Sequence, residues 1–123
     1  MNHSSAIVTA ARASFLFASL LLVGCFDPCA NTLKSEATSP DGKYVATAFI
    51  RDCGATTDFS PQVHLRPAGQ HVGEIGNVFI GNHSDKIEIE WISNRQLVIY
   101  CDCPVVRLET NYHGIVIEKR EKK

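Results

Sequence analysis

The chain has 123 residues, of which 45% are hydrophobic, and its 12 Lys and Arg against 13 Asp and Glu give a net charge of −1 at pH 7. This balance argues against the basic surface by which proteins bind nucleic acid, so we expect no nucleic-acid partner. The length suits one small domain with a modest core, which covalent cross-links would help to stabilise.

The N-terminal segment has the pattern of a signal for export. Arg12 is the one charged residue before position 25, and an apolar run of 11 residues, 13–23, follows it. Such a run is typical of a signal-peptide core and is too short to cross a bilayer as a helix, which needs about 20 residues. We therefore predict a cleaved signal peptide over residues 1–24.

The sequence Leu22-Val23-Gly24-Cys25, directly after the apolar run, resembles the lipobox of bacterial lipoprotein precursors. The resemblance implies cleavage between Gly24 and Cys25 and attachment of lipid to the Cys25 thiol. Two or more acyl chains, at about 0.8 kcal/mol per buried CH₂, hold a protein stably on a membrane. In such lipoproteins an Asp after the cysteine favours the inner membrane, so Phe26 implies the outer membrane. The alternatives are an ordinary secretory signal or an uncleaved anchor.

Four further cysteines allow three pairings, and an oxidising periplasm favours disulfides. We prefer a bond between Cys29 and Cys53, which would stabilise the domain by about 2–4 kcal/mol. Cys101 and Cys103 are two residues apart, and on a flat strand their Cβ atoms would exceed the distance of roughly 3.5–4.5 Å that a disulfide requires. They either bond where Pro104 bends the chain, pair elsewhere, or stay thiols.

Residues 25–38 are predicted to be the lipidated cysteine and a tether, since they are polar and lack apolar periodicity. Residues 39–123 are predicted to form a single β domain, which opens with the strong turn signal Ser39-Pro40-Asp41-Gly42. The stretch 41–46 can be laid on 94–99 at an offset of 53. We interpret this echo as two hairpins of one domain, because a β-propeller needs more blades than the chain can hold.

Strand-like patterns follow one another to the C-terminus, and the clearest is 86–92, where Ile87, Ile89 and Trp91 alternate with Glu88 and Glu90. The stretch 44–51 has apolar residues on both faces, which is typical of a central strand. Further strands are expected at 62–66, 78–80, 96–102, 105–110 and 115–119, the last two as a hairpin around 111–114. The prediction is an all-β fold of about seven short strands: a small antiparallel sheet, a sandwich or an open barrel.

The runs Ser-Pro-Asp-Gly-Lys-Tyr-Val-Ala at 39–46 and Arg-Asp-Cys-Gly-Ala-Thr-Thr at 51–57 resemble a family of small uncharacterised bacterial lipoproteins. The resemblance extends over most of residues 39–100 and includes the strand that contains Trp91. It implies the location and the architecture of the chain, and it implies no activity.

A connection of nine residues, 52–60, is longer than a hairpin needs and is rich in small polar groups. We take Thr56, Thr57, Asp58 and Phe59 as a candidate binding loop that offers hydroxyls, a carboxylate and an apolar contact. The alternative is a long connection whose hydroxyls bond to their own backbone.

The function expected from these patterns is a non-catalytic binding or structural role on the periplasmic face of the outer membrane. The partners would be the membrane, through the lipid anchor, and an envelope protein, with no cofactor. One alternative is a metal- or redox-handling lipoprotein that uses Cys101 and Cys103 with His64 or His113. A weaker alternative is a small hydrolase built from Asp58, Ser60 and His64, which no local signature supports.

Overall fold

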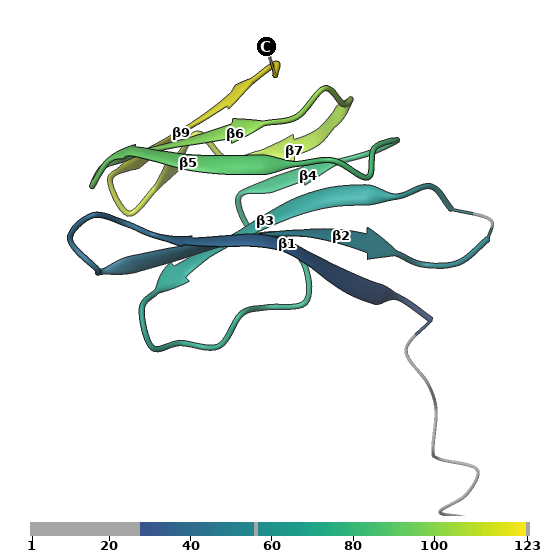
Figure 1. The fold of residues 1–123 in the computed structure, drawn as a ribbon, viewed down its shortest axis with the longest axis horizontal. Helices are drawn as coiled ribbons and strands as arrows, with labels where there is room; N and C mark the ends of the chain where they lie inside the picture. The colour runs from purple at the N-terminus through teal and green to yellow at the C-terminus, as the bar shows by residue number, and fades with distance from the viewer. Residues whose placement is uncertain (1–27, 56, 123) are drawn as a thin grey trace, which may run out of the picture.

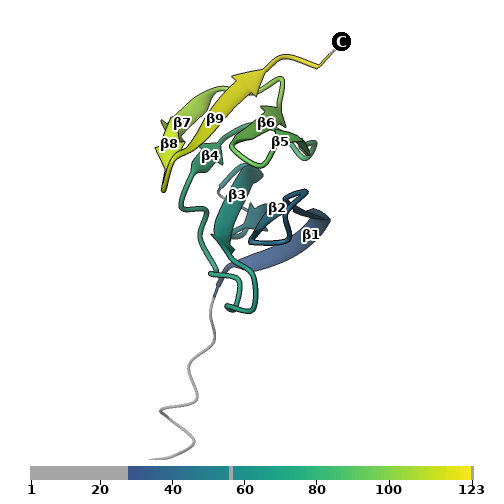
Figure 2. The same ribbon diagram turned by 90° about the vertical axis from the view of Figure 1, so that its left-hand side faces the viewer.

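The computed structural model describes residues 28–55 and 57–122, which form an all-β domain (Figures 1 and 2). The signal peptide and the lipid-attachment site predicted at residues 1–25, and Thr56 of the candidate loop, lie outside the described residues. Within the described ranges no helix is long and apolar enough to cross a membrane. The strands are β1 (Ala30–Thr38), β2 (Tyr44–Asp52), β3 (Ser60–Pro67), β4 (Phe79–Gly81), β5 (Glu88–Ser93), β6 (Gln96–Tyr100), β7 (Val105–Leu108), β8 (Asn111–Tyr112) and β9 (Ile115–Arg120).

The strands form two sheets that lie one above the other, as the layers of an open sandwich (Figure 1). One sheet has five strands in the order β1-β2-β3-β4-β7, and the other has four in the order β5-β6-β9-β8. All pairs are antiparallel except β6 and β9, which are parallel. The prediction of an all-β fold is confirmed, and among its forms the structure is an open sandwich of one antiparallel and one mixed sheet.

The core lies between the two sheets and follows the alternation of apolar residues along the strands. Leu65, Phe79 and Leu97 are fully buried there. The predicted alternation around Trp91 is confirmed, because Ile87 is buried and Ile89 and Trp91 pack against the core, while Glu88 and Glu90 are exposed. The other buried members include Ala46, Ala48, Ile50, Val63, Val78, Ile99, Ile115 and Ile117.

The central strand β2 is buried on both faces, as its sequence predicted, because a loop covers the outer face of its sheet. This loop, residues 68–78, connects β3 to β4 beneath the sheet (Figure 1), and we call it the strap. The side chain of Asn77 donates to the Leu65 carbonyl (2.7 Å) and accepts from the Leu65 N–H (2.8 Å). The N–H of Gly76 donates to Oε1 of the buried Gln62 at 2.8 Å. The strap thus ties itself to β3 by polar contacts.

The predicted tether over residues 25–38 is wrong for its second part, because residues 30–38 form β1. This strand pairs antiparallel with β2 along its whole length, with a register shift between Leu33 and Ser35. It is an exposed edge strand, so its order comes from backbone hydrogen bonds to β2 and needs no apolar alternation. The β domain therefore starts about ten residues earlier than the sequence indicated.

The hairpin predicted near the C-terminus is also wrong for its first strand. After β6 the chain crosses to the five-stranded sheet, where β7 pairs with β4 and Leu108 lies opposite Phe79. The hairpin around 111–114 is limited to β8 and β9, and β9 continues parallel to β6. Leu108 packs against the core from its place beside β4, so burial rather than sequence proximity selects the partner.

The internal echo corresponds to the hairpins β1–β2 and β5–β6, one in each sheet, which confirms the two-hairpin interpretation. The turns of the two hairpins also touch each other. The N–H of Asp41 donates to Oδ1 of Asn94 at 2.8 Å, and these two residues are equivalent positions of the echo.

Candidate functional site

A pocket of about 520 Å³ lies at the end of the sandwich where β2 passes into β3. Three segments meet there: the loop 53–59, the turn 82–84 after β4, and the part of the strap near Ile75. The side chains that matter chemically belong to Arg51, Thr57, Asp58, Ser60, Ile75 and His83. The pocket therefore adjoins the loop that the sequence marked as a candidate for binding.

The loop is closed at its base by a disulfide between Cys29 and Cys53, the pair preferred on the sequence, with Cα atoms 3.9 Å apart. Asp52 accepts the N–H of Gly54 at 3.0 Å, and both the N–H and the hydroxyl of Thr57 donate to the Gly54 carbonyl at 3.1 Å. The Thr57 hydroxyl thus bonds to its own loop, as the alternative interpretation of this segment expected. Phe59 is 45% exposed at the outer edge of the loop.

The Asp58 carboxylate is hydrogen-bonded to the ring Nδ1 of His83, which the turn after β4 brings to the loop. Two hydrogen bonds lower the pKa of the Asp58 carboxyl. The larger effect comes from His83, and the smaller from the N–H of Phe59, which donates at 2.8 Å. His83 has a positive φ of 56°, a conformation that few side chains adopt and that aims the ring across the turn. The sequence carried no signal for this pair, because its members are 25 residues apart in two different connecting segments.

Ser60 does not combine with Asp58 and His64 as a hydrolase would require. Its hydroxyl donates to the Gly81 carbonyl at 2.7 Å and accepts from the Gln62 amide at 3.0 Å, so its one proton is already committed to the backbone. His64 lies four residues along β3, about 13 Å away at 3.3 Å per residue. Burial, and secondarily Arg66, lower the pKa of His64.

Arg51 is the cation of the pocket. Its Nη1 donates to the Asn31 side chain at 3.0 Å and to the Glu74 carbonyl at 3.1 Å, which holds the guanidinium between β1 and the strap. Its Nε and Nη2 have no hydrogen-bond partner in the described part of the chain. A fork with unused donors is suited to an anion such as a phosphate or a carboxylate.

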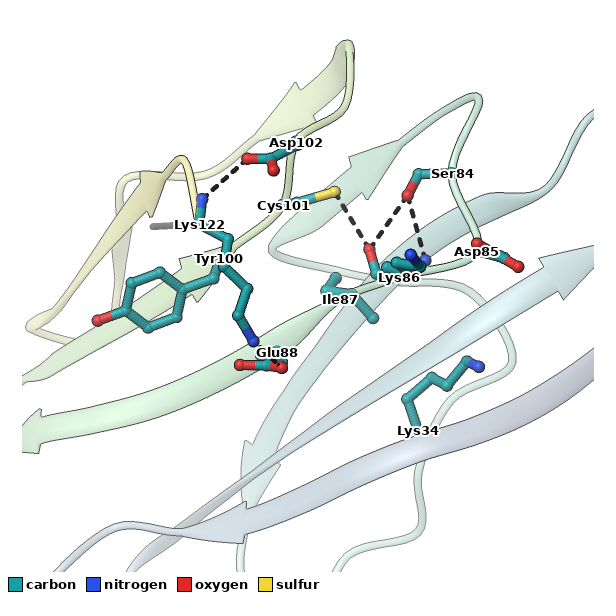
Figure 3. A pocket seen from close by; sticks show the side chains of 10 residues that line it. All are labelled: Lys34, Ser84, Asp85, Lys86, Ile87, Glu88, Tyr100, Cys101, Asp102 and Lys122. Atoms are coloured by element: carbon teal, nitrogen blue, oxygen red, sulfur yellow. Dashed lines mark hydrogen bonds and ion pairs between the residues drawn. The ribbon is translucent and has the colours of Figure 1, made fainter.

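A second pocket, of about 620 Å³, opens between β1 and the start of β5 at the same end of the sandwich (Figure 3). Lys34, from the irregular part of β1, faces it from one sheet. At the rim of this pocket the Lys122 ammonium forms an ion pair with Glu88. The backbone N–H of Lys122 donates to the Asp102 carboxylate at 2.8 Å. Three lysines and three carboxylates line this pocket, so its charges balance in number.

Cys101 lines this second pocket and is bonded to Cys103, with Cα atoms 5.4 Å apart. The strand predicted over 96–102 ends at Tyr100, so the two cysteines lie on irregular chain rather than on a flat strand, which removes the geometric objection to their pairing. His113 lies in the turn between β8 and β9, with its ring 4.4 Å from that of Tyr112. In residues 28–55 and 57–122 no group of three or more His, Cys, Asp or Glu is placed to hold a metal ion.

Comparison with known proteins yields one match. The model of a family described as a family of unknown function (DUF5412) matches residues 17–112. No curated protein and no solved structure matches the chain. The matched segment contains both the loop 53–59 and the turn with His83, so the pocket lies within the part of the chain that the family defines.

Proposed function

The chain belongs to the DUF5412 family of unknown function, and we propose that it is an outer-membrane lipoprotein anchored through Cys25. Its β sandwich would face the periplasm and have a non-catalytic role in binding or in the structure of the envelope. The partners would be the membrane itself and an envelope protein.

The observation that carries the proposal is the lipobox-like Leu22-Val23-Gly24-Cys25 followed closely by a disulfide-closed domain. Cys29, four residues after Cys25, is already bonded to Cys53. The second pair, Cys101 and Cys103, is bonded as well. Disulfides persist in oxidising compartments such as the periplasm, which agrees with an exported chain.

A binding role is favoured over catalysis by the chemistry of the pocket. The Ser60 proton is committed to the Gly81 carbonyl, so this hydroxyl is not activated as a nucleophile. Arg51 offers donors without partners among the described residues, and the exposed side chain of Ile75 lines the same pocket. This arrangement provides affinity and orientation without a group prepared for covalent chemistry.

The anchor is tested by mass spectrometry of the chain purified from membranes. We expect a mature chain that begins at an acylated Cys25 and sediments with the outer membrane. Cys25→Ser should abolish acylation, whereas Ser14→Ala, inside the apolar run, should leave it unchanged. A purified chain that begins at Met1 with an unmodified Cys25 thiol would refute the proposal.

The choice of membrane is tested by the residue after the anchor. Phe26→Asp should move the acylated chain from outer-membrane to inner-membrane fractions on a density gradient, and Phe26→Ser should leave it in place. An unchanged distribution of the Asp variant would remove the argument for the outer membrane.

A protein partner is tested with a photo-reactive amino acid at position 57 in intact cells, because Thr57 lines the pocket. The same group at Val116, which is exposed on β9 in the other sheet, is the control. A cross-linked product specific to position 57 is expected, and identical products from both positions would contradict a partner at the pocket.

A further inference from the structure

Three large apolar side chains are exposed at the end of the domain where the chain enters, the end that also carries Arg51. They are Leu33, 62% exposed, Ile75, 56% exposed, and Phe59, 45% exposed. We call Leu33, Phe59 and Ile75 the tether-side patch.

Strand register and hydrogen bonds place Leu33 and Ile75 on the same side of the sheet as Arg51, and Phe59 lies in the loop at the same end of the domain. Leu33 is two residues from Asn31 and so lies on the same face of β1. The Asn31 amide donates to the Glu74 carbonyl at 2.8 Å, which sets the residue next to Ile75 against that face. Ile75 lines the pocket with Arg51, and Phe59 lies between two further lining residues, Asp58 and Ser60.

The length of chain between the anchor and the domain decides what this patch meets. Cys29 follows Cys25 by four positions, and a fully extended chain of that length spans at most about 14 Å. A tether that continued to residue 38, as the sequence suggested, would have reached about 45 Å. The disulfide to Cys53 also prevents the start of β1 from peeling away to lengthen the tether.

We infer that the tether-side patch rests on the bilayer that holds the lipid anchor, with Arg51 bonded to a lipid phosphate. This inference rests on the proposed function, because the anchor at Cys25 is what brings the bilayer within reach. The apolar side chains of the patch enter the interface and leave water. The Nε and Nη2 of Arg51 provide a fork that matches two phosphate oxygens.

Of the acidic residues beside the patch, Asp52 and Asp58 each have carboxylate oxygens engaged with the protein, and Glu74 contacts Asn31 and Arg51 through its backbone carbonyl. Asp52 accepts the N–H of Gly54, and Asp58 pairs with His83. Arg51 is held in place by Asn31 and Glu74 before any lipid binds, so little side-chain freedom is lost on binding.

The pose is tested by depth-dependent fluorescence quenching with the acylated full-length mature chain inserted into preformed vesicles of acyl-brominated phosphatidylcholine. Tryptophan is placed in the patch by Ile75→Trp and, as the matched control, on the other sheet by Val116→Trp, a position 50% exposed. The native Trp91 is half-buried and donates to the Ala37 carbonyl at 2.9 Å, so the unsubstituted chain supplies the background.

We expect the tryptophan at position 75 to be quenched at least threefold more than the one at position 116. Phe59→Trp repeats the measurement from the loop, in case the strap variant is poorly folded. Adding Arg51→Gln to Ile75→Trp should reduce quenching at least twofold, and unchanged quenching would overturn the assignment of the phosphate to Arg51.

Equal quenching at positions 75 and 116 would overturn the inference, as would a blue-shifted but unquenched tryptophan at position 75, which indicates a protein rather than lipid against the patch. Failure of the proposed function has a different signature. A chain without acyl groups would not float with the vesicles, whereas an acylated chain that floats without quenching keeps its anchor and refutes the inferred pose alone.

Discussion

The two faces of the five-stranded sheet are buried in different ways. The inner face is apolar, with Val63, Leu65 and Phe79 packed against the second sheet. The outer face buries polar side chains as well, among them Thr47 and Gln62, under the strap. The same sheet thus has an apolar inner face, and an outer face on which hydrogen bonds between side chains and the strap stabilise the packing.

The two faces differ in how strongly their stability depends on specific hydrogen-bond partners. On the outer face the Thr47 hydroxyl donates to Glu36 at 3.1 Å and accepts from Arg66 at 2.6 Å, and Gln62 accepts the N–H of Gly76. Buried polar groups are costly when unpaired, whereas apolar contacts tolerate rearrangement. The outer layer should therefore respond to single polar changes, and the inner layer to changes of volume.

The largest expected effect comes from emptying the inner layer. Phe79→Ala should lower the free energy of unfolding by about 3–5 kcal/mol, because Phe79 is fully buried and its removal leaves a cavity. Urea denaturation measures the loss. The matched control is Phe59→Ala, at an exposed position, which should change stability far less. Equal losses for the two variants would contradict the placement of the core.

The Cys29–Cys53 disulfide lies at the edge of the five-stranded sheet, where it links the start of β1 to the loop after β2. Its sequence separation is 24 residues. Replacing both cysteines by Ser should cost about 2–4 kcal/mol, because the unfolded chain regains the freedom that the cross-link removed. Thr57→Val, which removes one exposed hydrogen bond of the same loop, is the control and should stay within about 0.5 kcal/mol. A double variant as stable as the parent would mean that backbone pairing with β2 is enough to keep β1 in the sheet.

A polar change in the outer layer should cost less but act locally. Asn77→Ala removes the two hydrogen bonds to Leu65 and should lower stability by about 1–3 kcal/mol. Hydrogen exchange at the Leu65 amide should accelerate at the same time, because its acceptor is lost. Asn82→Ala, at a half-buried turn position with one exposed hydrogen bond to the backbone, is the control. Unchanged exchange at Leu65 would show that the strap is not held by this side chain.

The smallest effect is a pH dependence in the outer layer. Burial and the charge of Arg66 lower the pKa of His64 below its usual value of about 6.5, and its Nδ1 is buried without a hydrogen-bond partner in the described residues. The unfolded chain therefore binds a proton first as the pH falls. The stability is fully present above about pH 6.5 and declines as the pH falls toward the lower, folded-state pKa.

Thermal unfolding between pH 7.5 and pH 5 measures this dependence. His64→Gln should flatten the profile, whereas His71→Gln, at an exposed position on the strap, should leave the slope as it is in the parent. An unchanged slope in the His64 variant would place the responsible group elsewhere.

Strands that bury an apolar face could be predicted from the sequence, whereas a strand ordered by backbone hydrogen bonds could not. Alternation marked Val63, Leu65 and Trp91 as core residues, because apolar burial leaves a period-two pattern along a strand. β1 was missed, because an edge strand is ordered by its neighbour's backbone and needs no pattern of its own. At the candidate site the sequence indicated the loop and Asp58, but it gave no sign of the contact between Asp58 and His83.

The sequence by itself determined the all-β class, the faces that meet in the core and the turn at 39–42, because each of these depends on residues close together in the chain. Only the tertiary structure decided that β7 joins β4, that β9 runs parallel to β6, and that Arg51, Asp58 and His83 share one pocket. Such contacts depend on which distant segments bury surface together, and backbone groups, which are the same in every residue, make many of the bonds that hold them.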